Sequence, residues 1–133
     1  MRGERGFTLI ELAIVLVIAG LMAAIALPLI GSRVQGATLD SAVGELRATL
    51  REARATAIAQ DRSVAFRGDP AGGYWLDGEH RVVPKGLRIA TAAPIAFFAA
   101  GWSSGGRVIV QSGDGQRRVL SVDAVTGRAS LVR

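Results

Sequence analysis

An almost unbroken apolar run over residues 7–30 constrains this chain more than any other feature of its sequence. Between residues 12 and 27 no side chain is polar or charged. A helix over residues 7–30 would be about 36 Å long, enough to cross the hydrocarbon of a bilayer. The sequence therefore predicts a membrane-spanning helix over this range.

One acidic residue, Glu11, lies near the start of the apolar run. A carboxylate in hydrocarbon costs roughly 2.5 kcal/mol or more. A chain that carries one there is expected to use it, and the expected use is pairing with a positive charge inside the membrane.

A short polar segment precedes the apolar run, and it contains Arg2, Glu4 and Arg5 and ends in Gly6. In a secretory signal peptide the apolar core comes before the small-residue cleavage site. Here the candidate cleavage point, Gly6, comes first, so the apolar run would survive processing. The two arginines predict a cytoplasmic N-terminus, which places the rest of the chain in the periplasm.

The stretch Gly6-Phe7-Thr8-Leu9-Ile10-Glu11 resembles the class III signal of type IV pilins and type II secretion pseudopilins. The resemblance implies that residues 1–6 are a leader removed by a prepilin peptidase, which cuts between Gly6 and Phe7. It also implies N-methylation of Phe7 and pairing of Glu11 with the amine of a neighbouring Phe7. The alternative is an ordinary anchor with a chance acid near the membrane interface.

Pro28 lies near the end of the run. Proline removes a helical hydrogen bond and clashes with the preceding turn, so we expect a bend that would let the helix adapt during subunit assembly. The alternative is that Pro28 marks the end of the membrane span.

A second helical pattern occupies residues 31–60. Six apolar residues recur at alternating steps of four and three: Leu39, Val43, Leu46, Leu50, Ala53 and Ala57. This spacing forms one apolar stripe on a helix. We expect a helix over about residues 32–59, continuous with or bent from the first, whose stripe packs against a sheet.

The remainder, residues 61–133, has the pattern of a β-rich domain. Short β-branched or aromatic runs separated by turn signals predict strands at 63–67, 74–76, 80–83, 87–90, 95–98, 107–111, 118–122 and 129–132. The expected fold class is therefore α+β, with a long N-terminal helix packed on a C-terminal antiparallel β-sheet domain.

Within the pilin-like group, the body resembles GspH/FimT-type minor pseudopilins. The stretches that carry the resemblance are residues 50–58, 63–66, 73–75, 95–98, 101–106 and 122–128. One departure is Ala99-Ala100, where that family often has Pro-Asp, which puts the conformation of this loop in doubt. The absence of cysteine favours a pseudopilin, because many type IV pilins carry a disulfide loop.

The resemblance implies assembly rather than catalysis. It points to a minor pseudopilin of a type II secretion system, whose pseudopilus drives export of folded proteins across the outer membrane. The expected partners are other major and minor pseudopilins, the prepilin peptidase and the inner-membrane secretion platform. The expected location is the inner membrane, with a single pass and a periplasmic C-terminal domain.

The alternative function is that of a FimT-like minor type IV pilin involved in pilus assembly or DNA uptake, because FimT-like minor pilins include proteins that take up DNA and surface arginines can contact phosphates. The net charge of +5 is basic but well below that of an obligate nucleic-acid binder. The candidates are Arg47, Arg51 and Arg54 on one helix face and Arg107, Arg117, Arg118, Arg128 and Arg133 toward the C-terminus, the core set being Arg47, Arg51, Arg54, Arg117 and Arg118. Nearby acids leave open a merely solvated face, and the main interpretation includes no nucleic-acid partner.

No catalytic constellation is apparent, and we expect no enzyme activity, cofactor or metal. The single histidine, His80, has no metal-spaced partner and no nucleophile motif. Gly113-Asp114-Gly115 is interpreted as a turn, because too few carboxylates are near for calcium. Trp102, in the glycine-rich loop 101–106, either contacts a partner or folds back on the core.

Overall fold

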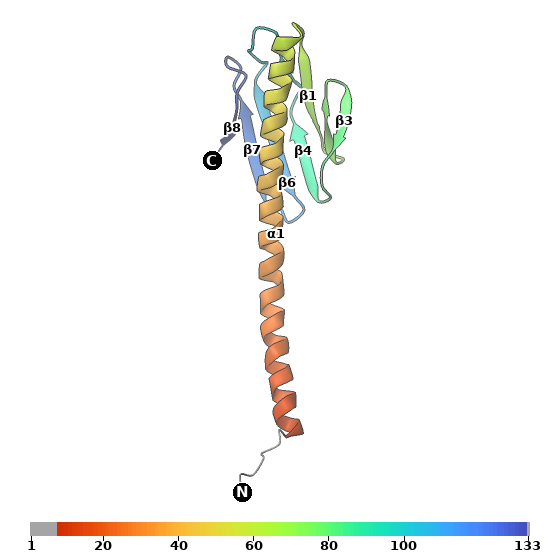
Figure 1. The fold of residues 1–133 in the computed structure, drawn as a ribbon, viewed down its shortest axis with the longest axis vertical. Helices are drawn as coiled ribbons and strands as arrows, with labels where there is room; N and C mark the ends of the chain where they lie inside the picture. The colour runs from red at the N-terminus through yellow and green to blue at the C-terminus, as the bar shows by residue number, and fades with distance from the viewer. Residues whose placement is uncertain (1–7, 133) are drawn as a thin grey trace. The chain divides into compact units, whose positions relative to one another are not determined.

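The computed structural model describes residues 8–132, and within this range the side-chain surroundings of residues 25–37 lie outside the description. The chain divides into two compact units, Met1–Val34 and Gln35–Arg133. One helix, α1 (Leu9–Ala59), contributes to both units and is followed by eight strands (Figure 1).

The helix begins with a capping interaction. The Thr8 hydroxyl accepts a long hydrogen bond of 3.4 Å from the N–H of Glu11, and the Thr8 carbonyl accepts bonds from the N–H groups of Glu11 and Leu12. Thr8 is thus the N-cap residue, and Thr8 and Glu11 occupy the two positions of a capping box. The threonine has a structural reason to be there whatever else it does.

The span predicted over residues 7–30 lies only partly in the described region. The structure assigns helix through Pro28, so α1 does not end at the proline. The bend expected there falls among residues 25–37, outside the described side chains. In the part of the chain that is described, no helix is both long and apolar enough to cross a membrane.

At its other end, α1 closes with a left-handed residue. Asp61 has a φ of 49°, and the N–H of Arg62 donates a 3.2 Å hydrogen bond to the carbonyl of Ala57. A hydrogen bond from the N–H of one residue to the carbonyl of the fifth residue before it is typical of a Schellman-type C-cap. It turns the chain directly from the helix into the first strand.

All eight predicted strands are present, with small shifts at their ends. They are β1 (Val64–Asp69), β2 (Gly73–Leu76), β3 (Glu79–Val82), β4 (Leu87–Thr91), β5 (Ile95–Phe97), β6 (Gly106–Ser112), β7 (Arg117–Val122) and β8 (Ala129–Val132). The predicted hairpin between β6 and β7 is confirmed, with Val108 opposite Leu120.

The strands form two antiparallel sheets rather than the single sheet expected from the sequence. One has the order β3-β2-β1-β5, and the other has the order β4-β6-β7-β8. The sheets approach at Gly68, whose N–H donates a 3.1 Å hydrogen bond to the Thr91 hydroxyl. A Cβ at Gly68 would lie 2.9 Å from the backbone of Ala90, so glycine allows this close approach.

The second unit has one apolar core, and the helix stripe forms one wall of it. All six stripe residues predicted from the sequence are buried, with at most 7% of their surface exposed. They join inward-facing strand residues, of which Phe66 and Phe97 are the largest that are fully buried. Figure 1 shows this C-terminal part of α1 lying along the strands. The α+β fold class is confirmed.

Candidate functional site

The N-terminal part of α1 presents an uncovered apolar surface. Every large apolar side chain from Leu9 to Met22 is at least 52% exposed. Contiguous apolar surface of this kind marks a binding surface for other proteins or for lipid. In this unit the helix therefore has apolar side chains available to other helices or to lipid.

Glu11 lies at the start of that surface and is exposed. Its backbone N–H is bound by Thr8, but its carboxylate has no hydrogen bond or ion pair to any residue in the described range. Gly6 and Phe7, the predicted cleavage site and methylation site, lie outside the described residues. The described residues thus leave the carboxylate available to a partner.

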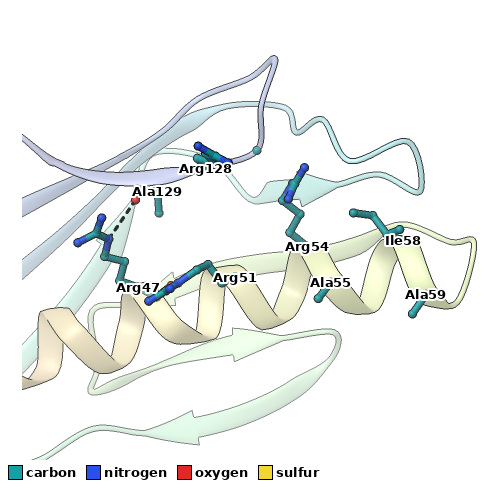
Figure 2. A pocket seen from close by; sticks show the side chains of 9 residues that line it. Arg47, Arg51, Arg54, Ala55, Ile58, Ala59, Arg128 and Ala129 are labelled. Atoms are coloured by element: carbon teal, nitrogen blue, oxygen red, sulfur yellow. Dashed lines mark hydrogen bonds between the residues drawn. The ribbon is translucent and has the colours of Figure 1, made fainter.

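A second candidate site is a groove between α1 and the start of β8 (Figure 2). Its volume is about 660 Å³, and it is lined by Arg47, Arg51, Arg54, Ala55, Ile58, Ala59, Gly127, Arg128 and Ala129. We call it the arginine groove. Three of its four arginines come from one helix face, at positions 47, 51 and 54, and the fourth comes from the turn before β8.

Backbone carbonyls hold the helix arginines through their Nε atoms. Arg47 donates to the carbonyl of Ala129 at 3.3 Å, and Arg54 donates to that of Gly101 at 2.8 Å. Arg51 makes a weaker 3.5 Å contact with the carbonyl of Arg47. Because only Nε is used in each case, the Nη groups of these guanidiniums stay available for a ligand.

The described part of the chain supplies no acid to the groove. No carboxylate of a described residue lies within 4.0 Å of the guanidinium nitrogens of Arg47, Arg51, Arg54 or Arg128. Three other arginines of the same unit do have such partners: Arg62 pairs with Asp77, Arg81 with Glu52 and Arg118 with Asp40.

The turn before β8, which carries Arg128, is closed by hydrogen bonds to Asp123. The Asp123 carboxylate accepts hydrogen bonds from the N–H of Thr126 at 2.7 Å and from its hydroxyl at 2.9 Å. The backbone bond from Thr126 is the main reason that the pKa of Asp123 lies below its usual range. The turn closes at Gly127, which has a φ of 63°.

Glycine is also required at position 127 because there is no room for a Cβ atom. A Cβ there would lie 2.7 Å from the carbonyl oxygen of Gly101 and 3.0 Å from Cδ of Arg54. The turn, the 101–106 loop and α1 therefore meet at this glycine.

The structure divides the arginines predicted for DNA binding. Arg47, Arg51 and Arg54 line the groove together, whereas Arg118 contacts Asp40 at 3.2 Å and Arg117 lies opposite Gln111 in the β6–β7 ladder. Arg128, from the wider set, joins the helix arginines. The sequence contains no local signal for this grouping, because it depends on where β8 lies against α1.

Trp102 packs on its own loop and stays half-exposed, and its contact with a partner remains a prediction. Its ring stacks on Phe98 with centroids 4.0 Å apart, while 48% of its surface is exposed. A tight turn closes between Phe98 and Trp102, with the N–H of Gly101 bonded to the Phe98 carbonyl at 2.8 Å. This turn forms around Ala99-Ala100 without the Pro-Asp typical of the family.

The remaining polar candidates are accounted for locally. His80 Nε2 lies 3.1 Å from the Asp69 carboxylate, and its ring packs on Trp75. Asp114 accepts hydrogen bonds from the Ser112 hydroxyl and from the backbone and side chain of Gln116, as a turn residue does. Among the described residues, no three His, Cys, Asp or Glu side chains are grouped as a metal site.

A long helix that is apolar and uncovered in one part and packed on antiparallel sheets in another defines a pilin-like class of proteins. Two crystal structures of the type IV minor pilin FimU of Pseudomonas aeruginosa PAO1 match this fold over part of the chain. Their TM-scores are 0.57 and 0.56, with 22% and 21% identity over 71% of this chain and 88% and 93% of theirs.

Sequence comparisons agree with the fold. Residues 1–27 match the prokaryotic N-terminal methylation motif. The chain is 30% identical to type II secretion system protein H of Xanthomonas campestris pv. campestris, over 95% of this chain and 82% of that protein. The chain therefore belongs to the type IV pilin-like superfamily and, within it, to the minor pseudopilin family that includes type II secretion system protein H.

Proposed function

We propose that the protein is a minor pseudopilin that assembles through its N-terminal helix into the periplasmic pseudopilus of a type II secretion system. The observation that carries the proposal is the uncovered apolar surface of α1, with Glu11 at its start, whose carboxylate has no partner among the described residues. The likeness to a type II secretion system protein supports the choice of system. The role is structural rather than enzymatic.

Processing would create the assembly-competent subunit. We infer cleavage by a prepilin peptidase between Gly6 and Phe7, followed by N-methylation of Phe7. Before cleavage the chain would cross the inner membrane once, with its N-terminus in the cytoplasm and residues 61–133 in the periplasm. A bend at Pro28 would let the helix fit its neighbours as the inner-membrane platform adds subunits to the pseudopilus.

Cleavage would also supply a positively charged partner for the Glu11 carboxylate. The new amino group of Phe7 is positive, and in a bundle of apolar helices it would pair with Glu11 of a neighbouring subunit. Leaving either charge unpaired in a low-dielectric bundle costs several kcal/mol. The pair would therefore select one register between adjacent subunits.

The test is Glu11→Gln, which keeps the size of the side chain and the backbone N–H that Thr8 binds, but removes the charge. We expect the variant to remain in the membrane and to lose crosslinking to other pseudopilins together with export. Glu45→Gln, at an exposed acid outside the apolar segment, is the control. Normal crosslinking and export by Glu11→Gln would refute the assembly role of this carboxylate.

Deleting the gene in its own host separates a secretion subunit from a pilus subunit. We expect loss of type II export, with pilus formation and DNA uptake unchanged. The reverse pattern would favour a FimT-like minor pilin. The DNA-binding set of that alternative is divided in this structure, because Arg117 and Arg118 lie apart from Arg47, Arg51 and Arg54.

A further inference from the structure

We propose that the arginine groove binds an acidic, partly apolar segment of another subunit of the same assembly. The chemistry of the groove is independent of the system in which the protein works. Only the identity of the partner as a co-assembled subunit rests on the function proposed above.

Charge is the first argument. Four guanidiniums line one groove, and within residues 8–132 no carboxylate neutralises any of them. Guanidinium groups recognise carboxylates through paired, charge-assisted hydrogen bonds. Arg47 and Arg54 are held by carbonyls at 3.3 and 2.8 Å, so part of the ordering cost of binding is already met within the fold.

The apolar lining is the second argument. Ala55, Ile58, Ala59 and Ala129 lie between or beside the arginines, and Ile58 is 46% exposed. A volume of about 660 Å³ can hold several side chains. The groove thus suits a segment in which carboxylates alternate with small apolar residues, rather than a simple anion.

The backbone of β8 is the third argument. The Arg128 carbonyl accepts a 2.9 Å hydrogen bond from the N–H of Asp123. Because successive carbonyls along a strand point to opposite sides, the Ala129 carbonyl points to the other edge, where Arg47 binds it. β8 is the last strand in its sheet, so the groove lies beside a sheet edge, a place where extended peptides bind, although Arg47 already occupies the Ala129 carbonyl.

The same observations disfavour a nucleic acid. Single-strand binding surfaces combine a charged track with aromatic side chains on which bases stack. No aromatic residue of the described part of the chain lines the groove, and Arg118, which lies outside it, is already paired with Asp40. The positive charge therefore forms a local pocket and not a track.

The experiment is site-specific photocrosslinking in the host cell with the full-length chain. A benzophenone side chain at Ala59, which lines the groove and is exposed, is compared with one at Ile109, which is exposed between the inward-facing Val108 and Val110. We expect the probe at position 59, and not the one at 109, to crosslink to another pilin-like subunit. Mass spectrometry should map the crosslink to a segment with at least two Asp or Glu residues.

A charge reversal tests the recognition itself. Arg51→Glu combined with Arg128→Glu should lower the crosslink yield by about tenfold or more, while Arg107→Glu, at an exposed arginine of β6, should not. Neither the Arg51 nor the Arg128 side chain bonds to a distant element in the described structure, so the double variant should fold. An unchanged thermal unfolding midpoint would confirm this.

The proposal is overturned by a crosslink to nucleic acid, by a mapped segment without carboxylates, by no protein crosslink, or by an undiminished yield in the charge-reversed variant. A mapped acidic crosslink in a strain whose export does not need this protein would refute the proposed function but keep the groove proposal. If export depends on the protein but no such crosslink forms, the groove proposal is refuted and the proposed function stands.

Discussion

The Nε–H of Arg54 donates a 2.8 Å hydrogen bond to the carbonyl oxygen of Gly101, a residue far away in the sequence. Gly127 lies against both of them, with no room for a Cβ. One arginine thus connects α1, the 101–106 loop and the turn before β8. It also forms part of the wall of the arginine groove, so the groove and the fold depend on the same contact.

Replacing Arg54 should therefore affect stability. We expect Arg54→Ala to lower the free energy of unfolding by about 1–3 kcal/mol, because the Gly101 carbonyl loses a charged donor. Denaturant unfolding of the full chain in detergent micelles measures the change. Arg51→Ala is the matched control and should change stability by less than about 0.5 kcal/mol. Equal effects of the two substitutions would contradict the role assigned to Arg54.

Because of the atoms around it, Gly127 should tolerate substitution by alanine less well than other turn glycines with a left-handed backbone. Gly127→Ala adds a methyl group 2.7 Å from a carbonyl oxygen to the strain of a φ of 63°. Gly115→Ala adds only backbone strain, since nothing lies within 4 Å of its would-be Cβ. We expect a loss of about 1 kcal/mol at Gly115 and a clearly larger loss at Gly127. A smaller loss at Gly127 than at Gly115 would be inconsistent with the crowding.

Phe97 is fully buried in the core of the second unit. Phe97→Ala should lower the free energy of unfolding by about 3–5 kcal/mol, through lost burial and a residual cavity. Val125→Ala removes an apolar side chain that is 82% exposed and should be nearly neutral. Similar denaturation midpoints for the two variants would exclude the described core.

Acid should destabilise the domain. The pKa values of four aspartates lie below the usual range, mainly because of hydrogen bonds that each accepts: Asp69 from the N–H of Ala71, Asp77 from Arg62, Asp114 from Ser112 and Asp123 from the N–H of Thr126. A carboxyl whose pKa is lower in the folded state contributes stability above its unfolded pKa, about 3.9. That contribution disappears as the pH falls through the folded value.

We therefore expect the free energy of unfolding to fall as the pH decreases below about 4. Asp123→Asn removes one titrating group but keeps an acceptor for Thr126. The free energy of unfolding of this variant should therefore fall less steeply with decreasing pH than that of the wild type. Unfolding curves measured across the acid range test this. An identical pH dependence in the variant would show that the Asp123 turn contributes nothing to this loss of stability.

Much of the fold could be predicted because its signals are local. The stripe from Leu39 to Ala57 reports which helix face is buried, since a buried face recurs with the helical period whatever it packs against. The strands lie between turn signals, and the two-sheet division remained hidden because it depends on the close approach of Gly68 to Ala90. The Thr8 cap could also be predicted from the sequence, because Thr8 lies three residues before Glu11.

The sequence by itself determined that this is a pilin-like chain, because the apolar run, the glycine before it and the acid within it are adjacent along the chain. Tertiary structure alone decided which arginines lie together. Arg47 meets Ala129 across 82 positions of sequence, while Arg118 is paired with Asp40. Such grouping follows from how strands pack on a helix, and residue spacing along the chain does not encode it.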